Sequence, residues 1–114
     1  MSVKLSSRQV GDVSVVDVTG RITLGEGSSA LRDTLRDMVT KNQTKILLNL
    51  GDVSYIDSSG IGELVAGFTT VANSGGQLKL LNLTKRVKDL LQITKLYTVF
   101  DVHDDEAAAV RSFA

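Results

Sequence analysis

A short, nearly continuous apolar run near the middle of the chain constrains the fold most. Residues 46–50 read Ile-Leu-Leu-Asn-Leu. An antiparallel strand with one wet face would alternate apolar and polar residues, whereas a strand covered on both faces is apolar almost throughout. The run therefore predicts the central strand of a parallel or mixed sheet flanked by helices.

Two strands and a helix are predicted before this run. Residues 3–10 and 13–19 are strand segments separated by Gly11-Asp12, a dipeptide that favours a two-residue hairpin turn of type I′. Residues 28–40 carry apolar side chains at helical spacing, and Ser28 or Ser29 is available as the N-cap of that helix. The chain is therefore expected to open with a β-hairpin and an amphipathic helix.

After the central strand, helices and strands alternate. The turn-rich residues 51–57 precede a second helix, which ends near residues 74–76 and whose apolar stripe consists of Ile61, Leu64, Val65, Phe68 and Val71. A strand over 78–81, a helix over about 84–94, a strand over 99–102 and a short helix capped by Asp104 or Asp105 follow. This order predicts an α/β fold, with a mixed sheet of about five strands and about four helices packed on it, in one domain spanning residues 1–114.

Composition excludes several classes of function. Thirteen basic residues balance thirteen acidic ones, so the chain lacks the positive field that nucleic acids or anionic membranes attract. It has no cysteine, no signal-peptide core and no apolar run of membrane-spanning length. We expect a cytoplasmic protein with no nucleic-acid partner, no membrane partner and no bound metal.

A Ser- and Gly-rich segment at the predicted start of the second helix carries the most chemistry. Ser58 lies where the free amides and the positive end of the helix macrodipole could receive a phosphate, and Gly60 and Gly62 could let a partner backbone come close. The same residues also fit a plainer interpretation, in which Asp57, Ser58 and Ser59 only cap the helix and the glycines only allow close packing. Local chemistry leaves both interpretations open.

Residues 55–62, Tyr-Ile-Asp-Ser-Ser-Gly-Ile-Gly, resemble the aromatic/apolar-Asp-Ser-Ser/Thr-Gly-apolar-Gly signature of the STAS (sulfate transporter and anti-sigma factor antagonist) family. The opening hairpin and residues 18–22, 46–50 and 90–100 resemble further landmarks of that family in the same order, so the resemblance covers essentially the whole chain. In its stand-alone members, the serine after the Asp is phosphorylated by an anti-sigma factor with serine kinase activity, and a metal-dependent serine phosphatase reverses the reaction.

The resemblance implies an anti-sigma factor antagonist with Ser58 as phosphoacceptor and Ser59 as the alternative. While Ser58 is unphosphorylated, the chain would sequester its anti-sigma factor and free a sigma factor for transcription. The partner-binding residues would be Asp57, Ser58, Ser59, Gly60, Ile61 and Gly62. The chain departs from the family in one loop, where many antagonists have Gly-Glu-apolar-Asp and residues 20–23 read Gly-Arg-Ile-Thr.

Three other functions compete with this one. A hydrolase could use Ser58, Asp57 and the single histidine, His103, but the segment is not a Gly-x-Ser-x-Gly elbow, so we expect no catalytic residue. A nucleotide site would need a third glycine at position 65, which is Val, so no cofactor is expected. The remaining alternative is a non-switching STAS subunit of a lipid-transport ATPase or a stress-sensing assembly.

Overall fold

The computed structural model describes residues 3–113 as five strands, four α-helices and one 3₁₀ turn. The strands are β1 (Val3–Val10), β2 (Val13–Ile22), β3 (Lys45–Ile56), β4 (Gln77–Leu81) and β5 (Val102–His103). The helices are α1 (Glu26–Thr40), α2 (Ser58–Asn73), α3 (Lys85–Ile93) and α4 (Glu106–Arg111), with a 3₁₀ turn, η1, at Tyr97–Val99. The predicted α/β class and element order are confirmed.

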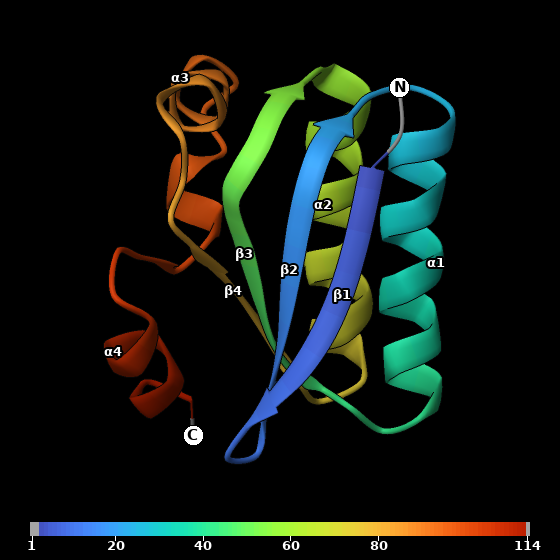
Figure 1. Cartoon of the computed structure of the whole chain (residues 1–114), viewed down its shortest axis with the longest axis vertical. Helices are drawn as coiled ribbons and strands as arrows, with labels where there is room; N and C mark the ends of the chain where they lie inside the picture. Colours follow the sequence, from blue (N-terminus) through green and yellow to red (C-terminus); the bar gives the residue numbers. More distant parts are fainter. Residues whose placement is uncertain (1–2, 114) are drawn as a thin grey trace.

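The five strands form one mixed sheet in the order β1-β2-β3-β4-β5. β1 runs antiparallel to β2, and the other neighbours run parallel. Helices α1 and α2 lie side by side along the sheet, whereas α4 lies near the opposite end from α3 (Figure 1). As a result, the C-terminal ends of β2 and β3, the start of α2 and helix α3 all lie at one end of the molecule (Figure 1).

The core has two parts because β3 is covered on both faces. Ile46, Leu48 and Leu50 belong to the larger apolar cluster, together with buried side chains of α1, α2 and α3. Leu47 points the other way, into a smaller cluster that Ala109 of α4 completes. The prediction of a central strand from residues 46–50 is therefore confirmed.

The strand predictions were wrong at two places. Residues 51–57 were expected to form turns, but β3 continues to Ile56, because Val53 and Ile56 are buried and irregular pairing with β2 keeps the strand in the sheet. The last strand was expected over 99–102 but covers Val102–His103. Phe100 is buried with its ring 5.6 Å from that of Phe68, so the segment before β5 follows side-chain packing rather than strand pairing.

Two local predictions were also wrong in detail. Helix α1 begins at Glu26 after Gly25, whose φ is 98°, and Ser28 is buried inside the helix, its hydroxyl donating to the Thr23 carbonyl at 3.0 Å. In the hairpin turn only Gly11 has a positive φ, of 63°, which is the pattern of a type II′ turn rather than type I′. Glycine adopts such a φ without strain, while the Asp that follows avoids it.

Candidate functional site

Asp57 fixes the start of α2 at the C-terminal end of β3. One carboxylate oxygen of Asp57 accepts a hydrogen bond from the Gly60 backbone N–H at 2.9 Å, and the Asp57 N–H donates to the Ile22 carbonyl at 3.3 Å. Asp57 is therefore the N-cap of this helix, one of the three capping candidates that the sequence analysis considered. Helix α2 therefore begins at Ser58, beside the last residue of β2.

The second carboxylate oxygen of Asp57 holds a loop from another part of the chain. It accepts a hydrogen bond from the Leu24 N–H at 3.1 Å. Burial alone would raise the pKa of Asp57, but the N–H groups of Gly60, Leu24 and Ser59 together bring it below its usual value. Asp57 is thus an ionised anchor for two backbone segments and not a free proton acceptor.

Ser58 occupies the first turn of α2 and is exposed. Among residues 3–113 its hydroxyl has no hydrogen-bond partner, whereas the neighbouring Ser59 is half-buried. The start of a 16-residue helix carries free N–H groups and a partial positive charge. A phosphate on the Ser58 oxygen would project into solvent at the end of the helix that stabilises it.

The two glycines of the motif have different environments. A Cβ at Gly60 would overlap the Ile22 carbonyl oxygen and come within 2.6 Å of Ile56, whereas a Cβ at Gly62 would meet nothing within 4 Å. Gly60 is therefore needed for close packing of α2 on the ends of β2 and β3. The sequence analysis expected Gly60 to give a partner access, whereas its bare side faces the interior of the protein. Ile61 is buried as well, with 3% of its surface exposed.

At this end of the molecule the sequence reasoning missed Leu24 and Arg86, and it noted Arg21 only as part of the loop that departs from the family pattern. Leu24 is the most exposed large apolar side chain of the described residues, at 79%. The guanidinium groups of Arg21 and Arg86 lie 4.7 and 4.4 Å from the ring centroid of Tyr55. Arg21 is paired with Tyr55 across the β2–β3 ladder, but no local pattern connects Arg86 of α3 to them.

The hydrolytic set considered from the sequence is not assembled. His103 lies on β5, where its Nε2 is 3.2 Å from Asp101 and 3.4 Å from the Ser112 hydroxyl. The carboxylate of Asp57 accepts hydrogen bonds from the backbone N–H groups of Leu24 and Gly60 and is not paired with His103. Between residues 3 and 113, no group of three or more His, Asp or Glu side chains is placed to hold a metal ion, and no helix in that part of the chain is long and apolar enough to cross a membrane.

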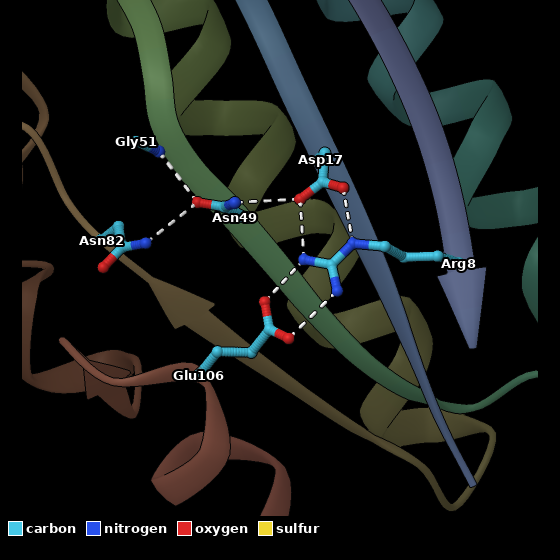
Figure 2. A network of polar contacts seen from close by, with 6 residues as sticks. All are labelled: Arg8, Asp17, Asn49, Gly51, Asn82 and Glu106. Atoms are coloured by element: carbon cyan, nitrogen blue, oxygen red, sulfur yellow. Dashed lines mark hydrogen bonds and ion pairs between the residues drawn. The ribbon is translucent and has the colours of Figure 1, made fainter. Parts of the chain in front are cut away.

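A second polar cluster joins α4 to the sheet (Figure 2). The Arg8 guanidinium donates to Asp17 at 2.8 Å and to Glu106 at 3.0 Å, and the Asn49 side chain donates to Asp17 at 2.9 Å. The hydrogen bonds from Arg8 lower the pKa values of both carboxyl groups, and those carboxylates in turn raise the pKa of Arg8. Asn82 extends the cluster through Asn49 at 3.4 Å. We call these residues the Arg8 network.

Comparisons with known proteins agree with this fold. The model of the STAS domain family matches residues 4–109. The anti-sigma-B factor antagonist of Bacillus subtilis is 32% identical over 102 residues, which is 90% of this chain and 92% of the relative.

Two solved structures have the same fold. The structure of an anti-sigma factor antagonist from Mycobacterium paratuberculosis superimposes with a TM-score of 0.86 at 20% identity, covering 98% of this chain and 94% of the other. The Bacillus cell fate determinant SpoIIAA in its phosphorylated form gives a TM-score of 0.73 at 19% identity, covering 95% and 97%.

Proposed function

Because the chain belongs to the STAS domain family, we propose that it is an anti-sigma factor antagonist whose binding is switched by phosphorylation of Ser58. In its unphosphorylated form it sequesters an anti-sigma factor with serine kinase activity and so frees a sigma factor for transcription. The observation that carries the proposal is the exposed Ser58 hydroxyl at the start of α2, without an internal partner among residues 3–113. A hydroxyl in that position is accessible to a kinase and can be covered by a partner.

The proposed switch acts through local electrostatics. Phosphorylation replaces a neutral hydroxyl by a group of about −1.5 to −2 charges with three strong acceptor oxygens. The start of α2 tolerates that charge, so the fold is expected to persist. A partner surface that had closed over Ser58 would have to desolvate an anion, and the complex should separate.

In this proposal the chain is a cytoplasmic binding protein, and the chemistry belongs to its partners. The anti-sigma factor supplies the kinase activity, and a metal-dependent serine phosphatase restores the hydroxyl. The carboxylate of Asp57, which binds Gly60 and Leu24, positions the acceptor segment and takes no proton in either reaction.

Intact-mass analysis tests the assignment. The full chain is incubated with ATP and each ATP-dependent anti-sigma factor encoded in the same genome. One added phosphate is expected, retained in Ser59→Ala and lost in Ser58→Ala. The reverse pattern moves the acceptor to Ser59. No phosphorylation by any of these kinases contradicts the switch and favours the non-switching STAS subunit.

A further inference from the structure

The surface beside Ser58 carries two arginines without a carboxylate partner. Arg21 at the end of β2 and Arg86 at the start of α3 lie over the ring of Tyr55, at 4.7 and 4.4 Å from its centroid. Neither forms an ion pair with any residue of 3–113, in contrast to Arg8, which is held by two carboxylates. Both positive charges are therefore available to a group outside the chain.

Stacking on Tyr55 also prepares these arginines for binding. A guanidinium is planar and weakly hydrated, so it lies on an aromatic ring while its N–H groups stay free to donate at the edges. A side chain already held in one place loses less conformational entropy when a partner binds. An acidic surface would meet two preorganised, bidentate donors here.

Leu24 adds an apolar side chain to the same surface, and the peptide group that joins Thr23 to Leu24 is hydrogen-bonded on both sides. The Leu24 N–H donates to Asp57 at 3.1 Å, and the N–H and hydroxyl of Ser28 both donate to the Thr23 carbonyl at 3.0 Å. The Leu24 side chain is nevertheless 79% exposed. An exposed leucine with a hydrogen-bonded backbone, next to a functional segment, has the properties of an interface anchor. Its burial by a partner would remove apolar surface from water and so stabilise the complex.

None of the acidic side chains near this surface forms an ion pair with Arg21 or Arg86 within residues 3–113. Asp57 is bound by backbone N–H groups, and Glu63 of α2 faces Arg32 at 4.0 Å. Glu26 lies in the first turn of α1, where a carboxylate offsets the positive end of that helix. The surface formed by Arg21, Leu24 and Arg86 therefore combines two arginines that lack a carboxylate partner in residues 3–113 with an exposed apolar side chain.

We propose that Arg21, Leu24 and Arg86 form a docking surface that extends the Ser58 site and binds an acidic face of the anti-sigma factor, with Leu24 packing against an apolar part of that face. This inference rests on the proposed function and adds the chemistry of the partner. Arg21 stands where the family resemblance predicts a glutamate, so the charge presented to the partner is reversed. Opposite charges across an interface speed association and reject partners of the wrong sign.

The docking surface also strengthens the proposed switch. An acidic partner face held close to Ser58 by the arginines would be repelled by a phosphate on that residue, in addition to the desolvation cost. Phosphorylation and charge selection would then act through the same contact.

The test measures affinity by calorimetric titration of the unphosphorylated chain with the anti-sigma factor that phosphorylates it. Arg21→Glu and Arg86→Glu should each weaken binding by about tenfold or more, and the loss should shrink as salt rises. Arg36→Glu, at an exposed arginine of α1 without an ion pair in residues 3–113, is the charge-matched control and should stay within about twofold.

A second pair of variants tests the contribution of Leu24. Leu24→Ala should weaken binding by about tenfold, whereas Ile93→Ala, at another exposed apolar residue with 76% exposure, should have little effect. Melting temperatures near that of the wild type would show that each variant is folded.

The outcomes separate the two proposals. Unchanged affinity of Arg21→Glu and Arg86→Glu for a kinase that still phosphorylates Ser58 overturns the docking surface alone. If no anti-sigma factor binds the wild-type chain, both proposals fail. Recovery of Arg21→Glu binding by a Glu→Lys or Asp→Lys change in the partner would establish the contact directly.

Discussion

Arg8 and Arg21 lie on neighbouring strands of the same sheet, and their surroundings are opposite in kind. Arg8 donates to Asp17 and Glu106, and Asp17 is held in turn by Asn49, so that the donors and acceptors of the Arg8 network satisfy one another (Figure 2). Arg21 lies on Tyr55 and has no carboxylate partner in the described part of the chain.

The difference indicates how each region is used. Glu106 belongs to α4, so the Arg8 network attaches a short C-terminal helix to the sheet, and its polar groups have little capacity left for a ligand. At the Ser58 end, Asp57 binds backbone N–H groups and Gly60 is packed beneath the surface. The Ser58 hydroxyl, the Leu24 side chain and the two arginines are exposed to solvent. Mutations should therefore affect stability in the first region and partner binding in the second.

The largest effect on stability is expected beneath the Ser58 surface, at Gly60. Gly60→Ala places a methyl group against the Ile22 carbonyl and Ile56, and overpacking of this kind costs about 1–3 kcal/mol of unfolding free energy. A Cβ at Gly62 has open space around it, so Gly62→Ala should instead stabilise α2 by up to about 1 kcal/mol, because alanine has the higher helix propensity. Urea denaturation of both variants measures the difference, and equal effects would contradict the assigned packing role of Gly60.

The next effect concerns binding at the surface itself. Ser58→Asp adds one charge and should weaken the complex with the anti-sigma factor at least about tenfold, or ~1.4 kcal/mol, while the melting temperature stays near that of the wild type. Ser58→Ala should bind at least as well as the wild type. Calorimetric titration and thermal melts decide between this and a folding defect: an Asp variant of normal affinity, or one that unfolds, would leave the local electrostatic switch without support.

A smaller effect is expected from neutralising Arg8 or Arg21, and it should fall on stability for Arg8 and on binding for Arg21. Arg8→Gln removes two ion pairs of partly exposed groups and should lower the free energy of unfolding by about 1 kcal/mol, without changing affinity for the anti-sigma factor. Arg21→Gln loses only an exposed cation–π contact, worth about 0.5 kcal/mol, but should weaken binding. If Arg8→Gln weakens binding more than Arg21→Gln does, the division of roles between the two regions is wrong.

The smallest effect is the acid response of the Arg8 network. Folding lowers the pKa values of Asp17 and Glu106 from ordinary values of 3.8 and 4.5, so their contribution to stability is complete above those values and is lost as the pH falls through the lower, folded-state ones. The stability advantage of the wild type over Arg8→Gln should therefore be constant near neutral pH and shrink below pH 4.5. Urea midpoints measured from pH 7 to acid check this, and an advantage that grows on acidification would rule the linkage out.

Several elements could be predicted because their signals are local. The apolar run of residues 46–50 determines a strand covered on both faces, and the Gly11-Asp12 dipeptide determines a hairpin, although not which primed turn it adopts. Asp57 could be identified as a helix cap from the residues that follow it, since a cap bonds to an N–H only three positions away. The position of Ser58 in the first turn of α2 follows from that cap.

The extent of β3 and β5 could not be predicted from local signals. Residues 51–56 are rich in turn formers, and only pairing with β2 holds them in the sheet. Phe100 lies in an apolar segment that resembles a strand, and its contact with Phe68 on α2 is what displaces β5 to Val102–His103. In both cases a partner distant in sequence outweighs the local preference.

The sequence by itself thus determined the order of the elements, the central strand and the position of a serine at the start of a helix, because periodicity, capping and turn chemistry act over a few residues. Only the tertiary structure decided that Asp57 also binds the Leu24 loop, that Gly60 faces inward while Gly62 is open, and that Arg86 joins Arg21 on Tyr55. Each of these depends on parallel crossovers that bring the ends of β2 and β3 and the start of α3 to one end of the sheet (Figure 1). Contacts between segments so far apart in the chain produce no local pattern in the sequence, because the residues that flank each contact residue do not indicate its distant partner.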